Sequence, residues 1–199
     1  MKRFIGFIAT VALLEGVLSP SQAQFRWNPK PLPACRTFPI TEIGFNYRIS
    51  SDQATDQQLY IASDLGFMRN LSTRYALGAS NFVGFGDDSE FRGGLKLRVR
   101  KWFTNGTSLD ISPGILLWDS IWRFSRPGFT GSVDLKFEEW FGLSLIFEYR
   151  RAREEMYAHD TGIYLGMKSG SSAGLIGHGV VGLVAGVVGL IFLASFQSN

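Results

Sequence analysis

The sequence is poor in the residues that build disulfides, metal centres and hydrolytic sites. It contains one cysteine, Cys35, and two histidines among its 199 residues. A single cysteine excludes an intramolecular disulfide and a cysteine-based metal site. Only seven prolines are present and 45% of the residues are hydrophobic, so the composition is not that of a disordered chain. We therefore expect a folded protein with no metal and no cofactor.

An excess of charge of one sign is also missing. Lys and Arg total 20 against 17 Asp and Glu, which leaves a formal net charge of +3. This balance is too even to indicate a nucleic-acid partner, and no phosphate-binding glycine loop or nucleic-acid motif is present. Nothing in the sequence assigns a ligand-binding residue.

Alternation of side chains is the strongest positive signal. Lys96, Arg98 and Arg100 alternate with apolar neighbours, and a period of two is typical of a strand, because successive side chains point to opposite faces. Eight segments show this alternation and are predicted strands: 43–49, 59–67, 73–84, 93–103, 108–118, 133–138, 143–150 and 162–168.

The connections between these segments alternate in length. Short connections are expected at 69–72, 105–106 and 138–142, and longer polar loops at 50–57, 84–90, 120–128 and 151–161. Short turns at one rim and longer loops at the other indicate a meandering antiparallel barrel, which we place at residues 40–168.

One turn also predicts a register. If Val99 and Ile111 share a face, the loop between them holds an odd number of residues, so 104–106 forms a three-residue turn with Gly106 in the left-handed conformation. Arg100 then lies directly opposite Asp110. A two-residue turn, pairing Arg100 with Ile111, is the alternative.

Alternation alone does not say which face is inside. A soluble barrel such as a lipocalin would have the apolar face inward, with the charges in water. The polar faces carry both signs, however, so they could neutralise one another in a narrow interior, where an isolated charge would cost several kcal/mol. We predict an interior charge network of Asp64, Lys96, Arg98, Arg100, Asp110, Asp134, Lys136, Glu148 and Arg150.

Aromatic residues near the strand ends favour the same arrangement. Their rings suit a membrane interface, where one edge is wet and the other apolar. We predict such a girdle from Phe67, Phe85, Trp102, Phe103, Trp118, Trp122, Trp140 and Phe141.

The N-terminus has the features of an export signal. Lys2 and Arg3 precede a mostly apolar stretch at 4–18, and small residues at 21 and 23 predict cleavage before Gln24. Residues 1–23 are therefore a predicted signal peptide, with an uncleaved anchor helix as the alternative. Residues 24–39 hold four of the seven prolines and form a predicted extended lead-in.

With its eight alternating segments, its tight turns at Asn105-Gly106 and Glu139-Trp140-Phe141 and its export signal, the chain resembles the small outer-membrane β-barrel proteins of the A, X and W class. The resemblance covers 41–168. It implies an all-β, eight-stranded antiparallel up-and-down transmembrane β-barrel in the bacterial outer membrane, in contact with outer-membrane lipid. Proteins of this class usually end at the last strand, whereas here about thirty residues follow.

Those additional residues, 169–199, form a predicted Gly-rich hydrophobic C-terminal helix. The stretch 174–196 has no Lys, Arg, Asp or Glu and could span a bilayer as a helix. We expect it to pack against the barrel wall or to mediate self-association, with a nonspecific membrane-associated tail as the alternative. The small residues that would allow a close approach on one helical face are Gly179, Gly182, Gly186 and Gly189.

The expected role is structural or interaction-based and non-catalytic. One alternative is a small-molecule channel or carrier, which needs an open interior. The other is a lipid A-modifying, deacylase-like enzyme that uses a histidine with a serine. His159 or His178 would need a nucleophile such as Ser120 or Ser125, but Asp160-Thr161 after His159 does not match the His-x-Ser arrangement of such deacylases. The acids near His159 match no strong metal-ligand spacing.

Overall fold

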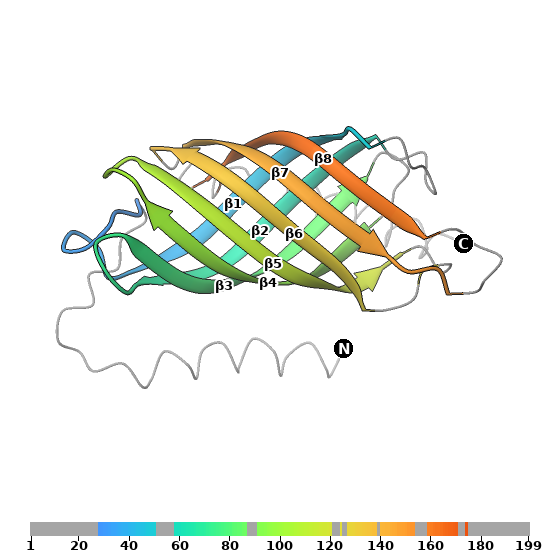
Figure 1. Cartoon of the computed structure of the whole chain (residues 1–199), viewed down its shortest axis with the longest axis horizontal. Coiled ribbons are helices and arrows are strands. Elements are labelled where there is room, and N and C mark those ends of the chain that lie inside the picture. The colour runs from blue at the N-terminus through green and yellow to red at the C-terminus, as the bar shows by residue number, and fades with distance from the viewer. Residues whose placement is uncertain are drawn as a thin grey trace, which may run out of the picture.

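The structure is a closed eight-stranded antiparallel β-barrel (Figure 1). The computed structural model describes residues 28–50, 58–86, 91–120, 124, 127–138, 140–153, 159–170 and 174. Each strand pairs with its neighbour in sequence, and the last pairs with the first. The strands are β1 (Thr37–Arg48), β2 (Leu59–Asn70), β3 (Tyr75–Gly86), β4 (Phe91–Trp102), β5 (Thr107–Asp119), β6 (Gly128–Phe137), β7 (Phe141–Arg150) and β8 (Asp160–Ser169).

The stagger of the strands defines a narrow barrel. A row of paired residues that starts at Thr37 returns to β1 at Tyr47, ten residues further along, which is the shear of the barrel. With a rise of about 3.3 Å per residue and a strand spacing of about 4.8 Å, this shear gives a strand tilt of roughly 40°. Eight strands enclose only enough room for side chains. The complete row is Thr37, Arg69, Leu77, Val99, Ile111, Val133, Leu145, Leu165 and Tyr47.

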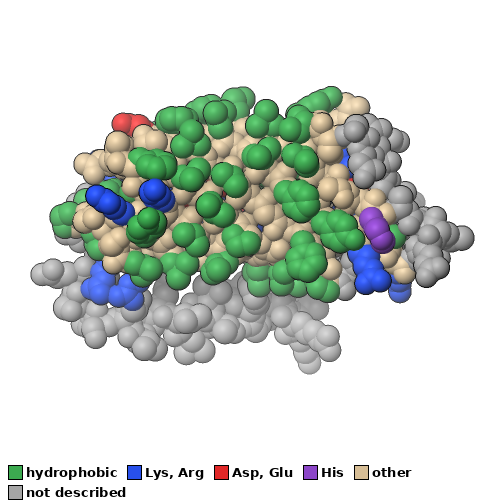
Figure 2. Space-filling view, viewed as in Figure 1, with side chains coloured by type: hydrophobic (Ala, Val, Ile, Leu, Met, Phe, Trp, Pro, Cys, Tyr) green, Lys and Arg blue, Asp and Glu red, His purple; other side chains and the backbone are tan. Residues whose placement is uncertain are grey.

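The two faces of the wall are inverted relative to a soluble barrel. On β4, Leu95, Leu97 and Val99 are 38%, 53% and 40% exposed. The intervening Lys96, Arg98 and Arg100 are at most 2% exposed. Hydrophobic side chains are spread over the barrel wall on the face shown in Figure 2. The alternative of an apolar interior with solvated charges is therefore wrong.

The predicted register between β4 and β5 is confirmed, but the predicted turn conformation is wrong. Arg100 pairs with Asp110, and the Phe103 amide donates to the Thr107 carbonyl at 3.0 Å. Gly106 does not adopt a positive φ. Instead, the Thr104 hydroxyl accepts hydrogen bonds from the amides of Gly106 and Thr107, at 3.2 and 3.0 Å, so a side chain stabilises the turn.

Some boundaries differ from the sequence prediction. β1 begins at Thr37, inside the predicted lead-in, and β8 ends at Ser169. The connection between β3 and β4 is only residues 87–90, as short as the turns at the other rim. We call the rim that carries connections 71–74, 103–106 and 138–140 the turn end, and the opposite rim the loop end.

Several predictions concern residues outside the described ranges. These are the signal peptide at 1–23, Trp122, Ser125, His178 and the glycines of the C-terminal helix. Within the described residues, no helix is long and apolar enough to cross a membrane.

Candidate functional site

The barrel interior is filled by buried charged side chains that come from every strand except β3. Among the described residues, eight cations and seven anions are at most 6% exposed, so their charges almost cancel. All nine residues of the predicted network lie there. The buried charged residues in the described part of the chain are Glu42, Arg48, Asp64, Arg92, Lys96, Arg98, Arg100, Asp110, Asp119, Asp134, Lys136, Glu148, Arg150, Asp160 and Lys168.

Nine of these residues form a turn-end cluster centred on Arg98: Glu42, Asp64, Lys96, Arg98, Arg100, Asp110, Asp134, Lys136 and Lys168. Arg98 Nη1 lies 2.9 Å from Glu42 Oε2, and Arg98 Nη2 lies 3.1 Å from Asp64 Oδ2. Arg98 Nε donates to the Ser80 hydroxyl at 3.0 Å. One guanidinium thus joins side chains from three neighbouring strands, β1, β2 and β3.

The lysines extend this cluster across the barrel. Lys168 Nζ lies 3.0 Å from Asp134 and 3.3 Å from Asp64. Lys96 Nζ also reaches Asp64, at 3.1 Å. The remaining acceptor capacity of Asp134 is used by two hydroxyls, those of Ser144 at 2.6 Å and Ser132 at 3.0 Å. Such additional hydrogen bonds help to offset the cost of removing the carboxylate from water.

The pair predicted from the turn length is a two-point contact. Arg100 donates to both carboxylate oxygens of Asp110, at 2.6 and 2.8 Å. Lys136 Nζ also lies 3.0 Å from Asp110 and forms an ion pair with Glu42. A bidentate Arg–carboxylate pair is stronger and more directional than a single hydrogen bond, so it anchors the β4–β5 hairpin from inside.

The other six residues form a loop-end cluster: Arg48, Arg92, Asp119, Glu148, Arg150 and Asp160. Asp160 accepts from Arg150 at 2.6 Å and from Arg48 at 2.9 Å. Arg92 and Glu148 pair at 2.6 Å, and Arg150 lies 3.5 Å from Asp119. Three cations and three anions make this cluster neutral.

An apolar layer adjoins the loop-end cluster. Tyr60, Ala62, Ile146 and Tyr164 form a buried cluster in which the two tyrosine rings lie 5.3 Å apart. The Arg92 guanidinium is 4.3 Å from the Tyr60 ring centroid and 5.6 Å from that of Tyr164. Along β2, Ala62 precedes Asp64 by two residues, so this layer continues directly into the turn-end cluster.

The turn end is closed by residues from before β1. Cys35, Phe38, Ile40, Met68, Ala76 and Trp102 form a second buried apolar cluster. The Asn70 amide donates to the carbonyls of Lys30 and Cys35, at 2.7 and 2.8 Å. Part of the predicted lead-in therefore packs under the barrel instead of extending away from it.

Trp102 corrects the predicted aromatic girdle. It is 4% exposed, and its Nε1 donates to Asn70 Oδ1 at 2.8 Å. Its ring lies 4.9 Å from the Arg100 guanidinium. Trp102 has the same parity as Arg100, so alternation places it inside. The girdle residues that are exposed on the outer surface are Phe67, Phe85, Phe103, Trp118, Trp140 and Phe141.

The sequence prediction missed six interior charges, namely Glu42, Arg48, Arg92, Asp119, Asp160 and Lys168. Parity within each strand could have found most of them, since Arg48 and Lys168 alternate with exposed apolar residues. Asp119 is different because a β-bulge shifts the β4–β5 register at Gly93/Gly94. The extra residue in β5 turns an odd-numbered side chain inward, and alternation does not predict this.

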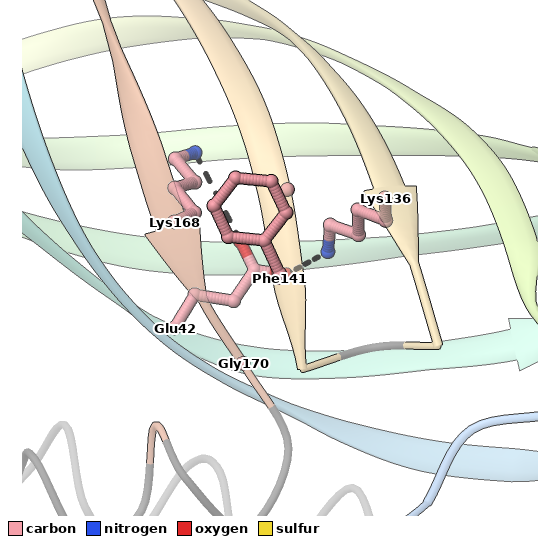
Figure 3. A pocket seen from close by; sticks show the side chains of 6 residues that line it. Glu42, Lys136, Phe141, Lys168 and Gly170 are labelled. Atoms are coloured by element: carbon pink, nitrogen blue, oxygen red, sulfur yellow. Dashed lines mark hydrogen bonds and ion pairs between the residues drawn. The ribbon is translucent and has the colours of Figure 1, made fainter.

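A small hollow lies at the turn end beside Glu42 (Figure 3). Lys136 and Lys168 approach Glu42 from two sides, and Phe141, Gly142 and Gly170 complete the lining. The hollow has room for no more than about one water molecule. Since Glu42 already pairs with both lysines, the hollow offers no unpaired charge to a ligand.

The residues of the enzyme alternative are not brought together as a triad in the described structure. Asp160 faces the interior and is engaged by two arginines, whereas His159 is exposed and its Nδ1 accepts from the Ala152 amide at 3.0 Å. The Ser120 hydroxyl accepts from the Phe91 amide at 2.9 Å. Among the described residues, no three His, Cys, Asp or Glu side chains group as metal ligands.

Comparisons with known proteins add little. No protein-family model matches the sequence, and no curated protein matches it. The chain is similar to a solved structure titled "De novo design of transmembrane beta-barrels", with 10% identity and a TM-score of 0.40, over 72% of this chain and 98% of that chain. At this TM-score the similarity carries no argument, and the barrel architecture is established by the strand pairing.

Proposed function

We propose that the protein is a non-catalytic outer-membrane β-barrel with a structural or interaction role. The observation that carries this proposal is the inversion of the wall, with charges inside and apolar side chains outside. Twenty-eight large hydrophobic side chains of the described residues are exposed. Soluble monomers rarely expose apolar patches of more than a few hundred Å².

The dimensions support a membrane-spanning wall. Twelve residues of β4, at a rise of about 3.3 Å and a tilt of roughly 40°, give a wall about 30 Å tall. Outer-membrane barrels present an apolar band about 25 Å tall. The bacterial outer membrane, and a role like that of the A, X and W class, are part of the proposal and also rest on the predicted export signal.

The packed interior argues against the channel or carrier alternative. Arg98 on β4 pairs with Glu42 on β1, and Lys168 on β8 pairs with Asp134 on β6, so ion pairs join strands that are not adjacent in the wall. A solute would have to displace these ion pairs, which would leave buried charges uncompensated.

Cell fractionation combined with gel mobility tests the proposal. The protein is expected in the outer-membrane fraction and should migrate faster when unboiled, because a folded barrel stays compact in detergent. Recovery as a soluble periplasmic protein would contradict the membrane assignment. In planar bilayers we expect no stepwise conductance.

Lipid analysis tests the non-catalytic part. Lipid A from cells with and without the protein is expected to be identical. A lipid A species that depends on the protein and disappears on replacement of His159 and His178 would instead support the enzyme alternative.

A further inference from the structure

Exposed basic side chains gather in one sector of the turn end. Lys and Arg side chains lie at this end of the barrel wall, at the left of the view in Figure 2. Apart from Arg151 and Arg153 at the loop end, every exposed Lys and Arg of the described residues belongs to this sector. We call it the basic sector, and its members are Lys30, Arg36, Arg69, Arg74 and Lys101.

Backbone contacts bring the first three of these residues together beside the end of β2. Arg36 directly precedes β1, and its carbonyl accepts the Asn70 amide at 2.9 Å. The Lys30 carbonyl accepts from the side-chain amide of the same Asn70 at 2.7 Å. Arg69 is the neighbour of Asn70 in β2 and lies on the outer face of the wall. Three cations from two segments of the chain therefore surround one strand end.

The connection from β2 to β3 carries the basic sector on to β4. Arg74 directly precedes β3, and its carbonyl accepts the Trp102 amide at 2.8 Å. Lys101, the neighbour of Trp102, lies opposite Tyr75 in the pairing of β3 with β4. The basic sector is therefore a continuous row along the rim, from the residues before β1 to the end of β4.

No exposed acid of the described residues interrupts this row. From the residues before β1 to the connection after β4, the described chain contains two acids, Glu42 and Asp64, and both are buried in the interior. The exposed Glu138 lies beyond the row, where its carboxylate would meet a Cβ atom at Gly106 at 3.0 Å. Like charges that lack opposite charges among them create a positive potential that attracts anions.

The basic sector lies at the edge of the apolar wall, next to exposed aromatic rings. Phe67 precedes Arg69 by two residues on the same outer face of β2, and Tyr75 is also exposed. Lys101 Nζ lies 5.4 Å from the centroid of the exposed Phe103 ring. Exposed aromatic rings mark the two interfaces of an outer-membrane barrel. In a bilayer, the cations of the basic sector would therefore lie at the level of the lipid headgroups.

We propose that the basic sector binds the phosphate groups of anionic phospholipids in the leaflet at the turn end. An Arg guanidinium can donate two parallel hydrogen bonds to a phosphate, and a Lys adds a compact positive charge. The row lies on the convex outside of the barrel beside the apolar wall, where the headgroups of the surrounding bilayer reach it directly. Anionic lipid would therefore gather on the β1–β4 side of the barrel. This inference rests on the proposed membrane location.

Photo-crosslinking of the full chain in lipid vesicles tests the binding. A diazirine-bearing residue replaces Tyr75, which directly follows Arg74 and pairs with Lys101. In the matched control it replaces Phe137, an exposed aromatic residue at the turn end of β6, outside the basic sector. The vesicles contain equal amounts of phosphatidylglycerol and phosphatidylcholine, and mass spectrometry counts the adducts of each lipid.

The expected result is an excess of the anionic lipid at one position only. A single Lys or Arg near an anionic membrane surface favours binding about fivefold. We therefore expect phosphatidylglycerol adducts to exceed phosphatidylcholine adducts about fivefold at position 75, and we expect no excess at position 137. In about 1 M salt the excess should disappear, because the Debye length falls to about 3 Å.

Substitutions test the cations themselves. Arg69→Gln, Arg74→Gln and Lys101→Gln together are expected to remove the excess at position 75. The control variant, Arg151→Gln with Arg153→Gln, removes exposed cations from the loop end and should leave the excess unchanged. Unboiled gel mobility verifies that each variant is folded.

The outcomes separate the possibilities. Equal adducts of the two lipids at position 75 would overturn the proposal in favour of an acidic protein as the partner of the basic sector. An excess that survives the triple substitution in the folded protein, or that the loop-end control removes equally, would also overturn it. Lipid adducts of either kind at position 137 report the membrane location independently, so failure of the lipid binding and failure of the membrane assignment are distinguishable.

Discussion

The pair formed by Arg92 and Glu148 offers a direct test of charge compensation inside the barrel. Arg92 Nη1 and Glu148 Oε2 are 2.6 Å apart, and both side chains are 1% exposed. With charge centres about 4 Å apart and an effective dielectric constant of about 20, their attraction is worth about 4 kcal/mol. Removal of one partner also leaves the other charge buried without its main compensation.

Arg92→Met and Glu148→Gln are therefore each expected to lower the free energy of unfolding by about 3–5 kcal/mol. The double variant is expected to lose no more than the worse single variant, since it leaves neither charge uncompensated. The measurement is urea unfolding in lipid vesicles, followed by tryptophan fluorescence and gel mobility, for the four members of the double-mutant cycle.

The matched control removes a cation from the outside of the same strand. Lys101 is exposed, so Lys101→Met is expected to change the free energy of unfolding by less than about 0.5 kcal/mol. The reasoning is refuted if the losses of the two interior variants simply add in the double variant, because that would mean the two charges do not compensate each other.

Three further changes test the outer wall, the turn-end apolar cluster and the strand spacing by the same unfolding measurement. Leu97→Arg, on the outer surface, is expected to cost about 2–4 kcal/mol in vesicles; a neutral result would contradict lipid contact. Trp102→Phe leaves the Asn70 Oδ1 acceptor without its indole donor and should cost about 1–3 kcal/mol, whereas an unchanged midpoint would argue against this hydrogen bond. Gly66→Ala would drive a methyl group into the backbone of β3 and should cost about 1–3 kcal/mol, against little change for Gly131→Ala; equal effects would show that β2 and β3 are not held this close.

The sequence was informative where a strand is regular. Alternation placed Lys96 and Arg98 on one face of their strand, the presence of both charge signs on the polar faces put that face inside, and the odd turn length paired Arg100 with Asp110. These predictions succeeded because inward and outward positions are set by parity, which sequence records directly. The inward direction of the polar faces could be inferred because they contain both acids and bases, which can neutralise one another in a narrow interior.

Other features of the interior could not be predicted from the alternation of inward and outward residues. Asp119 points inward because of a bulge, which depends on packing between β4 and β5. Cys35 is buried because a segment before the barrel folds under the turn end, a contact made at long range. Trp102 was misplaced because a general preference of aromatic rings for interfaces was given more weight than its own position in the alternation.

The balance of charge in the interior constrains how this protein can vary among related organisms. Arg100 and Asp110 neutralise each other, so a substitution that removes the charge at one of these positions should be accompanied by a substitution at the other. Their outward neighbours Val99 and Ile111 face no such requirement and should interchange freely among aliphatic residues. Covariation in the natural lineage should therefore concentrate on alternate positions along each strand.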